Sequence, residues 1–487
     1  MKKSRWLLSL VCVCLSAGCG ASMPVHSVVA GHFERGEYRE AALAADRGLQ
    51  QNPDDPALWR TKIAATARTG DHRGAVELYM EWHRLRRHYD LDALRRLAIS
   101  TLWHGLQDPS PAARVRAIEL ATRLAFDDVR DVLVERMSDD DAVVAAASAS
   151  ALLGRHRDAR ARALALLSSP EPRARALLIA GFGRSGDDRD QAILVQALDD
   201  PAPEVRRTAV TALGRHFAAR AQARLLEVAR SDSQGSVRAA ALRALGASKL
   251  ADDQAASIGR SALGDEYLGA RLAGLALITR RHPTTRGSGP SSSSSRSDPA
   301  ALLELIQTLP ADDVHVALRL AVALRAAGGE TPARVTQMIQ LGLGHSSWNT
   351  RVATLNALAE LVPAATAQDM AGDRINDPRP EVRLAAARVL TRTGASGRAG
   401  EVAAAELASP RGDIRVQAAV DLLRLDDPRG EGALGALSRN PSPDIRRAAA
   451  AAYRETEQPT LPLVTVLGDP AVEVRLEAAA ALLHLLD

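Results

Sequence analysis

The sequence predicts an all-α protein, a right-handed α-solenoid of stacked helix pairs, and two observations lead to this fold class. A motif, Asp-Pro-x-x-x-Val-Arg-x-x-Ala-x-x-Ala-Leu, returns about every 31 residues and is most complete from Asp200 to Leu213. The composition is 46% hydrophobic but only 3% aromatic, so Ala, Leu and Val would have to fill the core. A fixed period of this length is typical of repeat proteins, in which each unit buries its apolar side against its neighbours.

Each copy of the motif predicts one helix, and the residues before it predict another. An Asp followed by Pro is a favoured helix entry, with the Asp as N-cap and the Pro in the first turn. In the most complete copy Val205, Ala209 and Ala212 then share one helical face. An amphipathic stretch at residues 192–198 precedes it, so helix, turn and helix make one unit. The motif begins at Asp108, Ser138, Ser169, Asp200, Asp232, Gly264, Ala311, His345, Asp377, Ser409, Asn440 and Asp469.

The N-terminus has the layout of a signal peptide, predicted at residues 1–18. A basic start is followed by an apolar run from Trp6 to Leu15 and then by small residues. Ten apolar residues would rise about 15 Å as a helix, half of a hydrocarbon core, so a permanent membrane span is not expected. The ending Leu-Ser-Ala-Gly-Cys at residues 15–19 resembles the lipobox of bacterial lipoproteins. The resemblance implies cleavage before Cys19 and acylation of that residue, and a simple secretory signal is the alternative.

The cysteines and the next residue add to this interpretation. The chain has three Cys, at positions 12, 14 and 19, so Cys19 would be the only one left after cleavage and no intramolecular disulfide could form. Position 20 is Gly, whereas an Asp at this position would resemble an inner-membrane retention signal. We therefore expect an exported, lipid-anchored protein, in the outer membrane rather than the inner one. Its soluble body would lie in the periplasm or at the cell surface.

A second repeat comes after the lipidated Cys and tether predicted at residues 19–24. The pattern Gly36–Ala41 recurs 34 residues later at Gly70–Ala75, and Trp59 lies between the two. This resembles tetratricopeptide repeats, and the resemblance implies two helix pairs over residues 25–91. Two such repeats are fewer than usually stand alone, so we expect them to dock on the longer repeats that begin at residue 92.

From residue 92 to the end the longer motif resembles short HEAT repeats, the type also seen in bilin lyase subunits. The resemblance implies repeats 1–6 over residues 92–283 and repeats 7–12 over residues 298–487, in a curved array. The Gly/Ser-rich stretch 284–297 interrupts the period and has the composition of a flexible segment. It is interpreted as a surface loop, with a hinge or a docking loop as alternatives.

The arginine at the seventh position of the motif recurs in most copies. In HEAT arrays this Arg and the Asp of the motif form a ladder between adjacent repeats, so the resemblance implies a structural role; a nucleic-acid or anion site is the weaker interpretation. The predicted ladder consists of Arg114, Arg175, Arg206, Arg238, Arg351, Arg383, Arg415, Arg446 and Arg475.

If the ladder lies between repeats, the concave side formed by the second helix of each pair is the candidate binding surface. The positions one and five residues beyond the ladder Arg should project there, mixed with leucines such as Leu318 and Leu384. A surface of this mixture suits protein contacts better than a phosphate track. The candidates are Arg207, Arg243, Arg271, Asn356, Arg388 and Arg447.

Signals of catalysis are missing from the sequence. The twelve His are scattered, and no His-Glu-x-x-His or Cys-x-x-Cys spacing offers a metal site. We therefore predict no catalytic residue, no metal and no cofactor. The formal net charge of +4 includes three basic residues of the leader, and without them 59 basic residues face 58 acidic ones. Because nonspecific nucleic-acid binding needs an excess of basic charge, nucleic acid is not an expected partner.

These observations predict a non-catalytic, membrane-anchored scaffold that mediates protein–protein interactions in the bacterial cell envelope. One alternative is an assembly or trafficking factor that acts transiently on outer-membrane clients through the same surface. A less favoured one is an enzyme similar to the bilin lyases, since the repeats look alike. An exported protein would lack the chromophore, and a fold does not by itself transfer an activity.

Overall fold

The computed structural model describes residues 24–248, 250–279, 298–310 and 313–487. Within these ranges the regular secondary structure is helical throughout, and strands are absent. The predicted all-α solenoid is confirmed. The predicted leader at residues 1–18, the lipidation site Cys19 and the insert at residues 284–297 lie outside the described residues.

Among the described residues, four helices precede the long repeats and twelve helix pairs come after them. The first four are α1 (Val25–Glu34), α2 (Tyr38–Gln51), α3 (Pro56–Arg68) and α4 (His72–Arg86). The first helices of the pairs are α5 (Leu91–Gly105), α7 (Phe126–Arg136), α9 (Ala159–Leu166), α11 (Gln191–Gln196), α13 (Gln222–Ser231), α15 (Asp252–Ala262), α17 (Pro299–Thr308), α19 (Ala333–Leu343), α21 (Ala364–Gly372), α23 (Ser396–Glu406), α25 (Pro428–Leu437) and α27 (Leu461–Val466).

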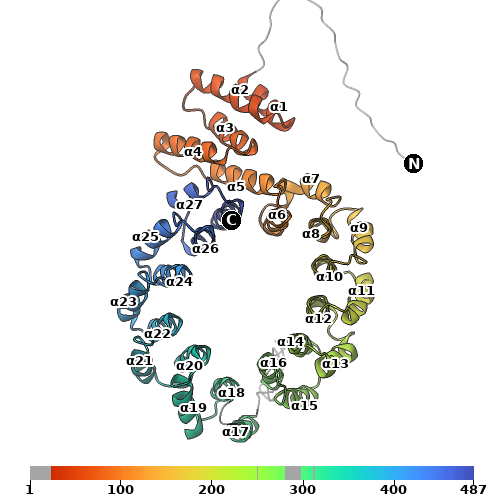
Figure 1. Ribbon diagram of the computed structural model, residues 1–487, viewed down its shortest axis with the longest axis vertical. Coiled ribbons are helices and arrows are strands. Elements are labelled where there is room, and N and C mark those ends of the chain that lie inside the picture. The colour runs from red at the N-terminus through yellow and green to blue at the C-terminus, as the bar shows by residue number, and fades with distance from the viewer. Residues whose placement is uncertain (1–23, 249, 280–297, 311–312) are drawn as a thin grey trace, which may run out of the picture.

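The second helices begin within the repeated motif, and they line the inside of the molecule (Figure 1). They are α6 (Pro111–Leu124), α8 (Ala142–Leu152), α10 (Pro172–Ser185), α12 (Pro203–His216), α14 (Gly235–Gly246), α16 (Leu268–Ile278), α18 (Val314–Ala326), α20 (Trp348–Leu361), α22 (Pro380–Arg392), α24 (Gly412–Leu423), α26 (Pro443–Ala452) and α28 (Val472–Leu486). Short 3-10 turns η1 (Asp188–Asp190) and η2 (Ala197–Asp199) flank α11, and η3 (Tyr453–Glu455) comes after α26.

The sequence predicted that the Asp of the motif caps the second helix, and this prediction is wrong for α12. Helix α12 begins at Pro203 with Ala202 as its N-cap, so Asp200 and Pro201 lie in the preceding turn. The Asp200 carboxylate instead accepts a hydrogen bond from the backbone N–H of Ala202, at 2.9 Å, which is an Asx turn. One carboxylate oxygen of Asp200 thus accepts the hydrogen bond that forms the turn, and the same carboxylate can still pair with an arginine of the neighbouring repeat.

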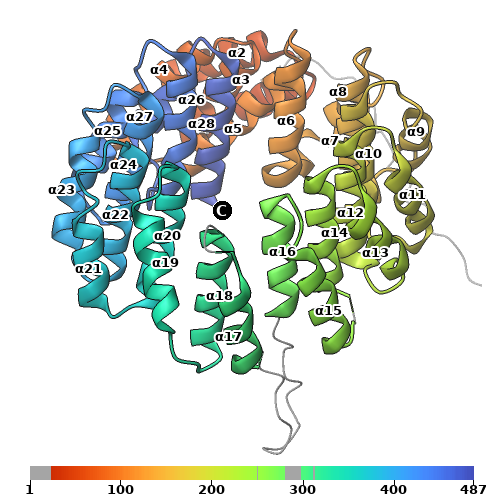
Figure 2. The same ribbon diagram turned by 60° about the horizontal axis from the view of Figure 1, so that its bottom comes forward.

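The array closes into a ring, which the sequence did not predict. The last helix, α28, packs against α5 and α6, so the two ends of the repeat array lie side by side (Figures 1 and 2). Leu476 of α28 reaches Gly105 of α5 so closely that a Cβ at this glycine would lie 2.6 Å from its Cδ2. Leu97 and Leu483 belong to the same buried core. We call the packing of α28 on α5 and α6 the ring closure, and the inner side of the ring the lumen.

Charged groups also cross the ring closure. Arg116 of α6 donates from Nε and Nη2 to Oε1 of Glu477 on α28, at 2.8 and 2.6 Å. The Glu477 residue is only 4% exposed. At the surface Arg95 pairs with Asp487 at 2.9 Å. The closure therefore combines an apolar core with a buried, hydrogen-bonded ion pair.

Two histidines, His72 buried and His104 half-buried, lie beside the ring closure. The rings of His72, on α4, and His104, on α5, meet edge to face with their centroids 4.8 Å apart. Burial, then the charge of Arg475 on α28 and the neighbouring His104, lower the pKa of His72 to about 3. Burial and Arg475 also lower the pKa of His104. Both imidazoles are therefore held neutral at the junction.

Candidate functional site

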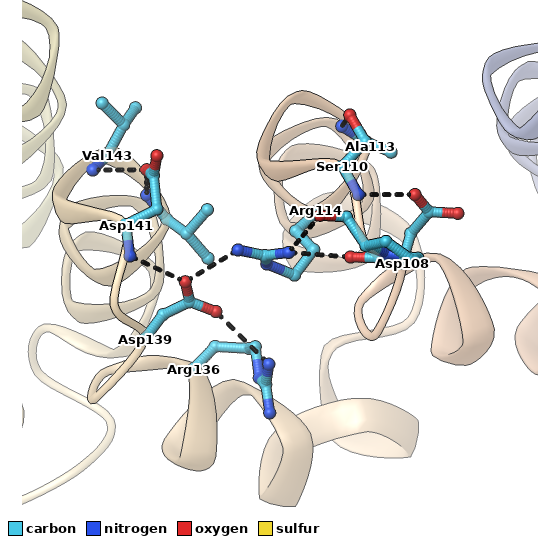
Figure 3. A network of polar contacts seen from close by, with 10 residues as sticks. Asp108, Ser110, Ala113, Arg114, Arg136, Asp139, Asp141 and Val143 are labelled. Atoms are coloured by element: carbon cyan, nitrogen blue, oxygen red, sulfur yellow. Dashed lines mark hydrogen bonds and ion pairs between the residues drawn. The ribbon is translucent and has the colours of Figure 1, made fainter.

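The arginine ladder joins most of the inner helices to the turn before the next one. Figure 3 shows the first rung, in which Arg114 of α6 donates from Nη1 to the carbonyl of Asp108 at 2.8 Å and from Nη2 to Asp139 at 2.9 Å. Asp139 belongs to the turn that leads into α8, and it also accepts the backbone N–H of Asp141. One guanidinium thus binds the turn of its own repeat and the turn of the next, as the resemblance implied.

Most rungs are bidentate. Arg206 donates from Nε and Nη2 to the two carboxylate oxygens of Asp232, at 2.8 and 2.9 Å, and from Nη1 to the carbonyl of Asp200 at 3.0 Å. Burial alone would raise the pKa of Asp232, but the hydrogen bonds from Arg206 and from the backbone N–H of Gln234 outweigh it and lower the pKa. Equivalent carboxylate pairs join Arg175 to Asp200, Arg238 to Asp265, Arg351 to Asp377, Arg383 to Glu406 and Arg446 to Asp469.

Two predicted ladder residues form half a rung. Arg415 donates to the carbonyl of Ser409 at 3.2 Å and Arg475 to that of Asp469 at 2.8 Å. Neither has an ion pair with a carboxylate among the described residues, and the Nε of each is buried without a hydrogen-bond partner. For Arg415 the reason is in the sequence, since the next copy of the motif begins with the uncharged Asn440.

The assignment of Arg271 to the binding surface is wrong, because this residue is part of the ladder. Its Nη1 donates to the carbonyl of Asp265 at 3.0 Å, and its Nε lies 3.0 Å from Asp313. The sixth residue before Arg271 is Asp265, so the sixth copy of the motif begins at Asp265 and not at Gly264. A count shifted by one residue moved this arginine to the wrong face.

The lumen carries a hollow surrounded by arginines. It lies between α10, α12 and α14, with a volume of about 430 Å³. Arg207, one of the candidates, and Arg184, Arg215 and Arg243 line it together with threonines, alanines and a glycine. All four arginines are exposed. No carboxylate lies among the described residues that line this hollow.

A second and larger hollow lies along the next pair of inner helices. Its volume is about 680 Å³, and it extends from Arg243 of α14 across α16 to Arg319 of α18. Leu272, Leu275 and Val322 provide an apolar lining between the two arginines. The described lining residues include no carboxylate and no aromatic side chain. Arg243, a predicted surface residue, therefore stands between the two hollows.

The other candidates lie on the opposite side of the ring. Asn356 and Arg388 line a hollow of about 270 Å³, but Arg388 is paired there with Asp421, its Nε 3.0 Å from both carboxylate oxygens. Arg447 on α26 is exposed, with Asp444 3.5 Å away. On this side of the ring, carboxylates therefore lie next to the lumenal arginines.

Sequence reasoning missed a further row of arginines. They lie nine residues beyond the ladder position, and nine residues at 3.6 per turn correspond to two and a half turns of helix. The ladder and this row therefore lie on opposite faces of the inner helices, a spacing the sequence could have revealed. Arg184 and Arg215 line the smaller hollow described above, and Arg392 and Arg424 line the one on the opposite side of the ring. Arg123 completes the row and lines a further hollow of about 350 Å³ between α6, α8 and α10.

Arg184 shows that the row is crowded with positive charge. Its Nη2 donates to Oγ of Ser150 at 2.7 Å. Although the Arg184 side chain is exposed, the protein around it partly desolvates the guanidinium, and this desolvation, followed by the charges of Arg215 and Arg155, lowers the pKa of Arg184. The lumen here favours an incoming negative charge.

Two further findings concern the described part of the chain. It holds no group of three or more His, Cys, Asp or Glu side chains placed to bind a metal ion. Of the helices described, none is long and apolar enough to cross a membrane.

One comparison with known proteins identifies HEAT repeats in part of the chain. Residues 161–246 match the family model of HEAT repeats. A comparison with curated proteins found no match. Among solved structures, YibA of E. coli is 17% identical, with 62% of this chain and 95% of that chain covered and a TM-score of 0.29. Kap121p bound to Nup53p is 14% identical, with 92% and 50% covered and a TM-score of 0.31.

A further structure is the karyopherin Kap121p bound to the extreme C-terminus of the protein phosphatase Cdc14p. It is 15% identical, with 88% of this chain and 49% of that chain covered and a TM-score of 0.30. The chain thus spans about half the length of Kap121p. At these identities and scores, the assignment as an α-solenoid rests on the chain's own helices and on its HEAT match.

Proposed function

We propose that this protein is a non-catalytic scaffold, anchored to a membrane through acylated Cys19, that binds partner proteins in the lumen of its ring within the bacterial cell envelope. The observation that carries the proposal is the lumen itself, where inner helices present two adjoining hollows of about 430 and 680 Å³. HEAT-repeat solenoids generally bind proteins through such extended surfaces. In this interpretation α1–α4 are two tetratricopeptide-like pairs docked beside the ring closure.

The lumen has the composition of a protein-binding surface. Arginine is among the residues enriched at protein interfaces, and apolar side chains form their centres. The larger hollow places Leu272, Leu275 and Val322 between Arg243 and Arg319. The ladder, by contrast, uses its arginines for contacts between repeats, so it contributes stability and leaves binding to the lumen.

The test is site-specific photo-crosslinking in cells. A photoreactive residue at Thr211, which is exposed and lines the smaller hollow, should crosslink to one or a few envelope proteins. The matched control is Leu164, 43% exposed on the outer helix α9, which should yield few products. Products from Leu164 alone, or from neither position, would refute a lumenal binding site. A stoichiometric product supports a scaffold, whereas substoichiometric, interchangeable products would indicate a trafficking factor instead.

The anchor has its own test. We expect Cys19→Ser to move the protein from the membrane fraction to the soluble fraction, because acylation of Cys19 is the anchor proposed. Metabolic labelling with an acyl-chain precursor should mark the wild type and not the variant. Retention of the variant on membranes would overturn the proposed mode of attachment without bearing on the lumen.

A further inference from the structure

One arc of the lumen concentrates basic charge, although the chain as a whole is close to neutral. The five consecutive inner helices α10, α12, α14, α16 and α18 contain a single carboxylate, Glu204, and we call them the basic arc. Their eleven arginines are Arg173, Arg175, Arg184, Arg206, Arg207, Arg215, Arg238, Arg243, Arg271, Arg319 and Arg325. The next five, α20 to α28, hold eight arginines and seven carboxylates.

Most of this charge is not neutralised within the protein. Four of the eleven arginines are ladder residues paired with carboxylates of the turns, at positions 175, 206, 238 and 271. The other seven have no ion pair with a described carboxylate. The guanidinium groups of Arg207 and Arg215, both on α12, have no hydrogen-bond partner among the described residues either, and both line the same hollow. An excess of like charge in one concave surface favours a ligand of opposite charge.

We propose that the basic arc binds an acidic segment of a partner protein, in extended conformation, whose carboxylates pair with the lumenal arginines while its apolar residues enter the larger hollow. This deepens the proposed function and rests on it. The apolar lining of Leu272, Leu275 and Val322 suits aliphatic side chains. Single-stranded nucleic acid, the other polyanion, is bound by grooves that stack bases on aromatic side chains. The described lining of the two hollows contains none.

The geometry of the solenoid sets the spacing of the segment. Neighbouring packed helices lie about 8–10 Å apart, and an extended chain rises about 3.3 Å per residue. Successive inner helices therefore meet every third residue of the segment. Five helices span about 40 Å, which corresponds to about 12 extended residues.

The experiment measures binding of a defined peptide to the purified full chain by fluorescence anisotropy. The probe is a 15-residue fluorescein-labelled peptide with Glu at every third position and Leu or Val between. We expect saturable binding that weakens as salt rises, and at least a tenfold loss in the double variant Arg207→Glu/Arg243→Glu. The matched control is Arg447→Glu, which changes the equivalent lumenal position on the charge-balanced side and should bind like the wild type. A peptide with Lys in place of Glu should not bind.

Three results would overturn the proposal. The first is that the peptide does not bind. The second is that Arg447→Glu weakens binding of the peptide as much as the double variant does. The third is that an unlabelled oligothymidine displaces the labelled peptide at a lower concentration than the unlabelled peptide does. The last result would assign the arc to nucleic acid. Failure here is separable from failure of the proposed function, because crosslinking from Thr211 reports any protein in the lumen whatever its charge. Circular dichroism of each variant establishes that it is folded.

Discussion

A buried ion pair crosses the ring closure beside its apolar core, and removal of this pair should favour opening of the ring between α28 and α6. The change is Glu477→Lys, which replaces the carboxylate bound by Nε and Nη2 of Arg116 with a second positive charge. Breaking a buried pair costs about 3–5 kcal/mol. The Arg116 side chain is 36% exposed, and it keeps Glu119 at 3.1 Å, so solvent and a second partner reduce this to about 2 kcal/mol. That is roughly a thirtyfold shift towards the open form.

The effect should be local, because each repeat contacts mainly its neighbours. Hydrogen exchange followed by mass spectrometry should show faster exchange in α5, α6 and α28, with α12 and α14 unchanged. Small-angle scattering should show a larger radius of gyration. Glu119→Lys is the matched control, since it faces the same guanidinium from within α6 but is 40% exposed at its side chain. It should exchange like the wild type.

The exchanged pair Arg116→Glu/Glu477→Lys should restore part of the lost protection, because opposite charges again meet across the junction. The reasoning would be refuted if Glu477→Lys left exchange of α28 unchanged. It would equally fail if exchange rose over the whole ring, since the pair would then stabilise the fold globally rather than the closure.

Three other predictions concern the ladder, the buried histidine and the insert. Arg206→Met should lower the free energy of unfolding by about 3 kcal/mol, because it leaves the buried carboxylate of Asp232 without its ion-pair partner. Arg415→Met removes no such pair, so it should lower the free energy of unfolding clearly less in the same urea titration. Equal losses in the two variants would contradict the structural role of the ladder. Lowering the pH from 6.5 towards 5 should destabilise the ring closure by up to about 1.4 kcal/mol per pH unit, because His72 takes up a proton near pH 6.5 when unfolded but near 3 when folded. The contribution is complete above pH 6.5 and lost on acidification, and a His72→Asn variant that keeps the same pH dependence would disprove it. Deletion of residues 284–297 should change the melting temperature by no more than a few degrees, because the Gly/Ser-rich composition of this segment predicts that it buries little surface, and a large loss of melting temperature would contradict this prediction.

The local structure was largely predictable because it depends on short-range patterns. The spacing of Val205, Ala209 and Ala212 identified a helical face without knowledge of the partner helix, and the turn before it was marked by Asp200-Pro201. Which residue caps the helix was not predictable in the same way. Asp200 has two possible roles, N-cap or Asx turn, and contact with Arg175 of the preceding repeat accompanies the second.

The candidate site was predicted in part. Arg207 and Arg243 were placed in the lumen by counting from the ladder, and they line the two hollows. Arg271 was misplaced by a count shifted by one residue, and Arg215 was missed because only two positions per helix were considered. A single sequence also gives no warning that Arg388 is neutralised, because its partner Asp421 lies 33 residues away on the next inner helix.

The sequence by itself determined the repeat, its helices and the chemistry of its ladder, since these depend on the order of residues within about 31 positions. Only the tertiary structure decided that the array closes. Each repeat rotates slightly against the last, and whether the sum of these rotations brings α28 onto α5 depends on packing angles that no residue pattern states. The curvature of the stack also places arginines spread from Arg184 to Arg319 on one concave arc, because the inner helices that carry them line the lumen. The chain as a whole is close to neutral, but this arc of the lumen carries an excess of positive charge.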